Sequence, residues 1–215
     1  MSSTEVLSSS NPLSPAIHPN DAPPGISRDS TLFPDNEVQK SSFRAYEIVR
    51  PHSRGSDYLE IQLDGQTLYW SHTHNKPLAG PKVDLHVDAE NGPIVASSQL
   101  DSMKRNSRIL HGNREEWTVV ACESFISASS FAFDLGSKSY RWKRTNDKSL
   151  GATRLENRSF KLLDIATGDV LATFVHVEGA LGTAQRSARI EYLIDLGVDL
   201  EIVSLVTILG IDRGE

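Results

Sequence analysis

The most constraining feature of this sequence is its final apolar run, residues 199–211, which reads DLEIVSLVTILGI. Only Glu201, Ser204, Thr207 and Gly210 interrupt large aliphatic residues that, at helical spacing, point in every direction around the axis. A helix that is apolar on all sides has to be enclosed on all sides, by protein or by lipid. Because the run is shorter than the ~20 residues that a bilayer span needs, it predicts a core helix that the remaining chain wraps.

Short alternating runs separated by turns precede this helix. Asp64-Gly65 is a strong hairpin signal, since type I′ turns need a positive φ at both central positions, and Asn91-Gly92 closes a second hairpin. Residues 83–88 alternate Val and Leu with Asp and His, which is the period of a half-buried strand. We expect ten or more antiparallel strands, in the segments 43–49, 58–63, 67–73, 83–87, 94–97, 107–110, 116–122, 129–135, 138–144, 159–165, 170–177 and 188–196.

These two features together limit the architecture. An open sheet covers one face of a helix, whereas a closed barrel covers the whole helix and leaves no exposed strand edges. The sequence therefore predicts a mainly β fold, a closed antiparallel β-barrel around a central hydrophobic C-terminal α-helix.

Residues 1–41 have a different composition from the rest. They hold nine of the serines and six of the ten prolines, with five acidic against two basic residues. Such a segment cannot bury enough apolar surface to offset the entropy of ordering it. We therefore expect a disordered Ser/Pro-rich tail at 1–41 and a barrel domain at 42–215.

Charge and motifs exclude several classes of protein. The formal net charge of −6 disfavours general nucleic-acid binding. The single cysteine, Cys122, excludes an internal disulfide framework and fits a reducing compartment. The first residues lack the basic and apolar regions of a secretory signal, so we expect a cytoplasmic protein without a transmembrane span. No glycine-rich phosphate loop, G-x-S-x-G or H-E-x-x-H motif occurs, so no catalytic residue or cofactor is predicted.

Three segments resemble the tubby C-terminal-like superfamily, which includes the phospholipid scramblases, and especially its small fungal members. They are SKSYRWKR at 137–144, FKLLDIATGDVLATFVH at 160–176 and the final apolar run. The resemblance covers about residues 43–213 and implies a twelve-stranded barrel around a hydrophobic helix. It also implies a lipid-related function, because tubby proteins bind phosphoinositides and scramblases are tied to lipid movement. The chain lacks a scramblase's cysteine-rich palmitoylation segment and acidic calcium-binding loop, which argues against scramblase activity.

The basic and aromatic segment 138–144 is the leading candidate binding site. In a strand, Arg141 and Lys143 share one face, opposite the face of Tyr140 and Trp142. On an outward face they could hold the phosphates of a lipid headgroup, Arg in a bidentate manner and Lys as a point charge. The alternative is a strand with core aromatics and solvated charges. The candidate headgroup residues are Lys138, Arg141, Lys143 and Arg144, with a second basic group at Lys104, Arg105 and Arg108.

Histidines and aspartates form a weaker candidate site. His72 and His74 would leave the same face of one strand, and Asp84, His86 and Asp88 the same face of the next. If the two faces met, these side chains could hold zinc or another transition metal. We favour solvated strand faces, because the DLHVD alternation already needs its polar side in water.

The sequence thus favours a non-enzymatic cytoplasmic protein, peripheral at a membrane surface, that binds phosphoinositide, another anionic lipid or a protein partner. The alternative is a small-molecule-binding or enzymatic accessory protein of a fungal metabolic pathway, with the barrel mouth as its pocket. A packed lumen would oppose that alternative, and an open mouth lined with His and Asp would favour it. A third possibility is a scaffold that partners recognise through residues 1–41.

Overall fold

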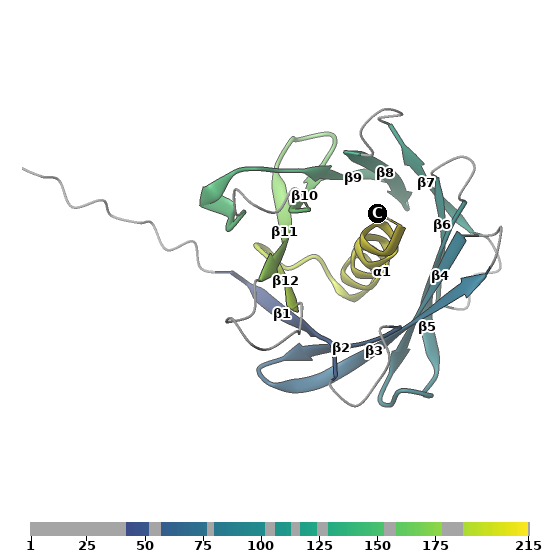
Figure 1. The fold of residues 1–215 in the computed structure, drawn as a ribbon. Helices are drawn as coiled ribbons and strands as arrows, with labels where there is room; N and C mark the ends of the chain where they lie inside the picture. Colours follow the sequence, from purple (N-terminus) through teal and green to yellow (C-terminus); the bar gives the residue numbers. More distant parts are fainter. Residues whose placement is uncertain are drawn as a thin grey trace, which may run out of the picture. The chain divides into compact units, whose positions relative to one another are not determined.

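The computed structural model describes residues 42–51, 57–76, 80–101, 106–112, 117–123, 129–152, 158–177 and 187–214; the predicted tail at 1–41 lies outside them. Twelve strands pair antiparallel, each with its neighbours in sequence, and the last pairs with the first to close a barrel (Figure 1). The strands are β1 (Arg44–Val49), β2 (Tyr58–Leu63), β3 (Gln66–Lys76), β4 (Gly80–Val87), β5 (Ile94–Leu100), β6 (Ser107–His111), β7 (Thr118–Cys122), β8 (Ser130–Leu135), β9 (Lys138–Arg144), β10 (Phe160–Asp164), β11 (Val170–Val177) and β12 (Ser187–Tyr192).

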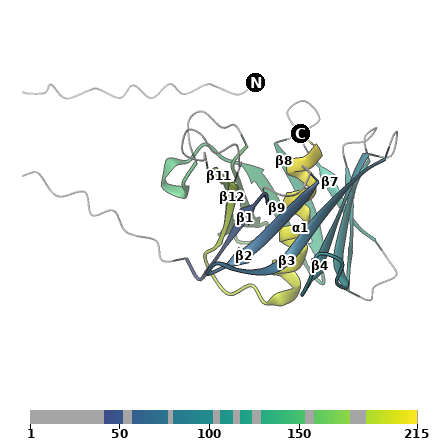
Figure 2. The ribbon, with the colours of Figure 1, turned by 60° about the horizontal axis from the view of Figure 1, so that its bottom comes forward.

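One long helix, α1 (Val198–Gly214), runs along the inside of this barrel (Figure 2). Its residues 200–211 are all buried, and Leu205 is only 1% exposed. The predicted fold class, a closed antiparallel barrel around a central C-terminal helix, is therefore confirmed. The lumen is filled by protein, as the all-round apolar sequence of the helix requires.

Local turn chemistry explains the hairpins that close the sheet. Asp64 and Gly65 both have positive φ, 51° and 78°, as a type I′ turn requires. The β4–β5 hairpin forms as predicted, but its connection is longer, and the positive φ lies at Asp88 (67°) rather than at Asn91. Gly92 is required there because a Cβ at this position would collide with the carbonyl oxygen of Val87.

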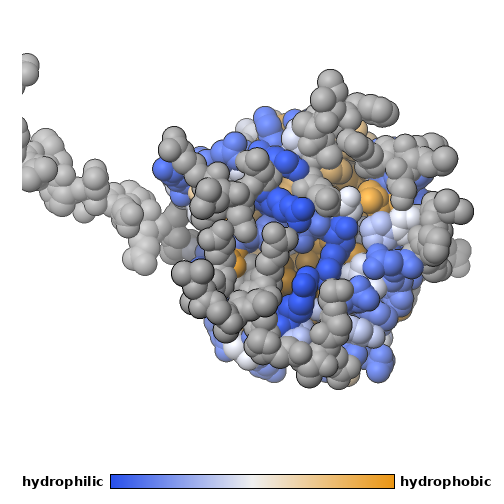
Figure 3. All heavy atoms as spheres, in the orientation of Figure 1, coloured by the Kyte–Doolittle hydropathy of each residue, from blue (hydrophilic) through white to orange (hydrophobic). Residues whose placement is uncertain are grey.

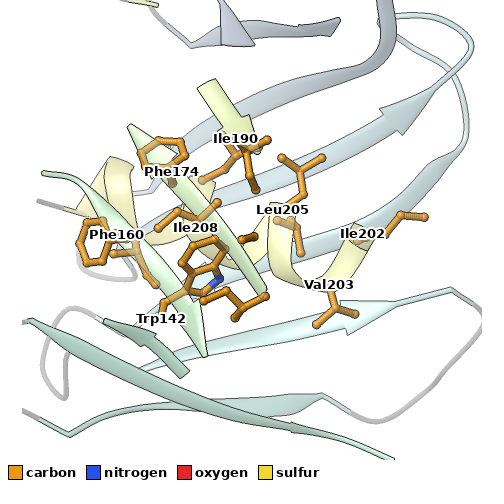
Figure 4. Close-up of a cluster of buried hydrophobic side chains, with 14 of the residues drawn as sticks. Trp142, Phe160, Phe174, Ile190, Ile202, Val203, Leu205 and Ile208 are labelled. Carbon is orange, nitrogen blue, oxygen red and sulfur yellow. The ribbon is translucent and has the colours of Figure 1, made fainter. Parts of the chain in front are cut away.

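The interior is asymmetric around the helix. Large side chains from β8–β12 fill one side, and Figure 4 shows Ile208 between Trp142 and Phe174. On the other side, α1 approaches the backbones of β4, β5 and β6 closely, with Gly210 against Ser98. Aromatic side chains on one wall and the small buried residues Ala96 and Ser98 of β5 on the other therefore help to set the position of the helix inside the barrel.

The helix carries one buried charge. Glu201, 5% exposed, accepts hydrogen bonds from Arg44 Nη1 at 2.7 Å and from the Tyr46 hydroxyl at 3.1 Å. The Tyr192 hydroxyl donates to the carbonyl oxygen of Glu201 at 3.0 Å. Burial raises the pKa of Tyr46 to about 12, so its hydroxyl remains a hydrogen-bond donor at neutral pH. These bonds join the first helical turn to β1 and β12, the two strands that close the barrel.

Candidate functional site

The predicted basic strand is β9, and its two faces separate as expected. Tyr140 and Trp142 are buried in the core, at 6% and 0% exposure, while Arg141 and Lys143 lie on the outer face. The Trp142 indole donates to the carbonyl oxygen of Ser204, which fixes β9 against α1. The outward direction of Arg141 and Lys143 therefore follows from the burial of Tyr140 and Trp142, which alternate with them along the strand.

Arg141 is already engaged by a carboxylate. Its Nε lies 2.7 Å from Glu123 Oε2, and its Nη2 donates to Glu123 Oε1 at 2.9 Å. Ser130 also donates to Glu123, at 2.7 Å. Partial burial would raise the pKa of Glu123, but the hydrogen bonds from Ser130 and Arg141 outweigh it and lower that pKa. Arg141 is thus paired with Glu123 through one hydrogen bond and a second close ion-pair contact.

Lys143 has a different environment. It is exposed and stands directly opposite Lys161 of β10, whose side chain is also on the outer face. Within the described residues, neither ammonium group forms a hydrogen bond or an ion pair. Like charges directly opposite on neighbouring strands are destabilising, so an anion placed between these two side chains would relieve their repulsion.

The other predicted basic residues are dispersed around the barrel. Lys138 lies at the end of β9 near the start of α1, and Arg144, at the opposite end of β9, covers the ring of Phe160. Arg108 belongs to β6, which β7 and β8 separate from β9, and it lies over the ring of Trp117. Lys104 and Arg105 lie outside the described residues. Of the predicted basic residues, Arg141 and Lys143 therefore lie together in one patch. The order of the strands adds Lys161 to this patch.

The histidine candidates meet on the outer face of β3 and β4. His72 stacks on Tyr58 with ring centroids 4.2 Å apart and touches His74, whose Nε2 lies 3.1 Å from Asp84 Oδ2. His86 instead bonds the carbonyl oxygen of Gly92 through Nδ1, at 2.8 Å. Within the described residues, no group of three or more His, Cys, Asp or Glu side chains is arranged to hold a metal ion.

Asp84 differs from the expectation that the polar side of β4 faces water. It is 3% exposed, because Lys82, His74 and Ser97 surround its carboxylate on the outer face. Burial would raise the pKa of Asp84, but hydrogen bonds from Lys82 and Ser97 outweigh burial and lower the pKa. Residues from two neighbouring strands thus enclose a side chain that the alternating pattern alone places in solvent.

This lowered pKa predicts a pH-dependent contribution to stability. A carboxylate with a depressed pKa stabilises the fold above its ordinary value of 3.8 and loses that contribution as the pH falls through its folded pKa. Asp84→Asn should lower the free energy of unfolding by about 1 kcal/mol at about pH 6. The difference between wild type and variant should shrink below about pH 4 in urea titrations. A difference that stays constant down to about pH 2.5 would contradict this assignment.

No known family model matches the chain, and no curated protein matches it. The tubby-like resemblance thus stays a prediction that rests on the three segments and on the architecture they imply. Within the described part of the chain, no helix is both long and apolar enough to cross a bilayer.

Proposed function

We propose that this protein is a non-enzymatic binding module that docks on anionic lipid headgroups through the outer face of β9 and β10. The observation that supports this most directly is the opposed pair Lys143 and Lys161, which lacks a carboxylate partner within the described residues. Arg141 extends the patch along β9, although Glu123 holds it in the absence of ligand. Phosphoinositides present the phosphate groups that such a patch would bind.

The structure of the patch suits a membrane surface. The two lysines stand on a rigid sheet whose inner side is fixed by Trp142, Phe160 and Leu162, each 0% exposed. Their positions are therefore preorganised, and only the flexible side chains need to adjust to a headgroup. An exposed basic patch is worth about 1 kcal/mol per Lys or Arg near an anionic membrane. Because the rest of the chain is acidic overall, we expect weak, salt-sensitive binding.

Sedimentation with vesicles tests this proposal. Wild-type protein should bind phosphatidylcholine vesicles that contain phosphoinositide, should not bind pure phosphatidylcholine, and should lose affinity as salt is raised. Lys143→Ala combined with Lys161→Ala should weaken binding about 30-fold, since two contacts of about 1 kcal/mol each are removed.

The matched control removes two positive charges elsewhere. Arg108→Ala combined with Lys138→Ala changes the net charge by the same amount, but neither residue belongs to the patch. This control should bind within about threefold of wild type, because only the general attraction changes. Equal losses in both double variants would show that net charge, and not the β9–β10 patch, governs binding. No binding of wild type to any anionic vesicle would refute the proposed function.

A further inference from the structure

A second basic feature lies at the end of the barrel where α1 finishes. A cavity of about 200 Å³ opens there, between the last turns of the helix and the ends of β1, β2, β11 and β12. Its polar lining consists of Arg50, Arg158, Arg213, His176 and Asp212, and its remaining lining is apolar. The C-terminal end of α1 faces the viewer in Figure 1, and Figure 3 shows strongly hydrophilic residues across the centre of this face.

The described lining of this cavity contains more arginine than carboxylate. Of its lining residues in the described part of the chain, three carry guanidinium groups and one, Asp212, carries a carboxylate; Asp57 also acts on Arg213 from nearby. The carboxylate of Asp212 is engaged by His176, whose Nε2 lies 2.8 Å from Asp212 Oδ1. Such an excess of arginine in one small cavity stands out in a chain whose formal net charge is −6. Arginine therefore outnumbers carboxylate among the described lining residues.

Arg213 gives the clearest sign of a missing partner. Its Nε and Nη2 are buried from solvent, and neither has a hydrogen-bond acceptor among the residues that the structure describes. Burial lowers the pKa of Arg213, and the charge of Arg50 lowers it further, while Asp212 and Asp57 favour its charged form. Buried donors without acceptors are costly. A ligand that brought oxygen acceptors into the cavity would satisfy them.

We propose that this cavity binds a small anion that carries a phosphate group, either as a free phosphate compound or as a lipid phosphomonoester. Guanidinium groups bind phosphate oxygens in a planar, bidentate manner that few other groups match. The volume exceeds that of several water molecules, at about 30 Å³ each, but it lies below the range of about 300–1,000 Å³ typical of larger ligands. One phosphate or a pyrophosphate fits this size.

The apolar lining strengthens the site. Ile48, Leu59, Phe174 and Leu209 form its walls, and a low-dielectric surrounding increases the attraction between guanidinium and phosphate. The end of α1 does not contribute, because a helix C-terminus carries partial negative charge. Attraction for an anion therefore comes from the three arginines, which arrive from separate parts of the chain.

Titration with pyrophosphate, followed by thermal unfolding and calorimetry, tests the proposal. At matched ionic strength, pyrophosphate should raise the melting temperature of wild type more than sodium chloride does. Arg158→Met and Arg213→Met should each weaken pyrophosphate binding at least tenfold, the effect of losing a charge-assisted contact. Without ligand, Arg213→Met should melt at the same temperature as wild type or higher, because it removes a buried, repelled charge.

Two controls separate this site from the other surfaces. Arg189→Met removes an arginine from the outer face of β12, where it pairs with Glu47 and Glu191, and should respond to pyrophosphate as wild type does. The Lys143→Ala/Lys161→Ala variant should also keep its pyrophosphate response. The proposal for this cavity and the proposal for the lipid-binding patch can therefore be refuted independently of each other.

Vesicles that contain phosphatidic acid distinguish the two sources of phosphate. Binding that pyrophosphate displaces and that Arg158→Met abolishes would identify a lipid phosphomonoester as ligand. A pyrophosphate response without such vesicle binding would identify a free phosphate compound. A wild-type response no larger than that to sodium chloride would overturn the proposal. A pyrophosphate response as large as that of wild type in both Arg158→Met and Arg213→Met would also overturn the proposal.

Discussion

Leu205→Asp should abolish folding of the barrel. Leu205 is 1% exposed at the middle of α1, and Figure 4 shows it pointing toward Ile190 of β12. A carboxylate at this position would be buried without a partner, at a cost of several kcal/mol. That cost is comparable to the whole stability of a domain, roughly 5–15 kcal/mol. We expect circular dichroism to show loss of the β-sheet signal at room temperature.

The control carries the same carboxylate on the outside of the barrel. Val119 of β7 is 57% exposed, so Val119→Asp should stay folded and change stability by less than about 1 kcal/mol. Leu205→Met, which nearly conserves volume, should cost less than about 1.5 kcal/mol. A folded Leu205→Asp variant with an unchanged melting temperature would show that α1 does not fill the barrel.

Gly210→Ala should destabilise the protein, although alanine favours helices more than glycine does. A Cβ at this position would collide with the Ser98 hydroxyl and lie 3.1 Å from the Ser98 Cβ. Overpacking of this kind costs about 1–3 kcal/mol, against a gain of about 1 kcal/mol in helix propensity. We expect a net loss of up to about 2 kcal/mol in urea unfolding, since α1 has to move away from β5.

Replacing Ser98 with glycine should reverse the sign of the stability change that Gly210→Ala causes. In a Ser98→Gly background the colliding atoms are absent, so Gly210→Ala should stabilise by about 1 kcal/mol through helix propensity alone. The double-mutant cycle should therefore give a coupling of about 1–3 kcal/mol. A coupling near zero would mean that Gly210 and Ser98 do not limit the approach of the helix to β5.

The patch on β9 and β10 was predictable only in part. The alternation of aromatic and basic residues in 138–144 correctly places Arg141 and Lys143 outside, because side chains on a strand alternate between two faces. Lys161 was missed, since it joins Lys143 only through the register between β9 and β10. A long connection separates these strands, and no short-range pattern fixes which residues then face each other.

The surroundings of the buried charges were likewise not predictable from the sequence. The sequence indicates that Glu201 interrupts an apolar helix, but its partner Arg44 lies 157 residues away. Asp84 follows an alternation that predicts exposure, yet its neighbours on β3, β4 and β5 enclose it. In both cases the environment of the charge comes from strands that meet only in the closed barrel.

The sequence by itself determined the architecture, because its signals are local. The period of two produces strands, the Asp64-Gly65 turn produces a hairpin, and the run at 200–211 demands complete enclosure. Tertiary structure alone decided which charges meet. Arg50, Arg158 and Arg213 surround one cavity because the ends of distant strands and the end of α1 converge there. Closure of the barrel and the register of its strands determine which charged residues come together, and both depend on packing across the whole barrel.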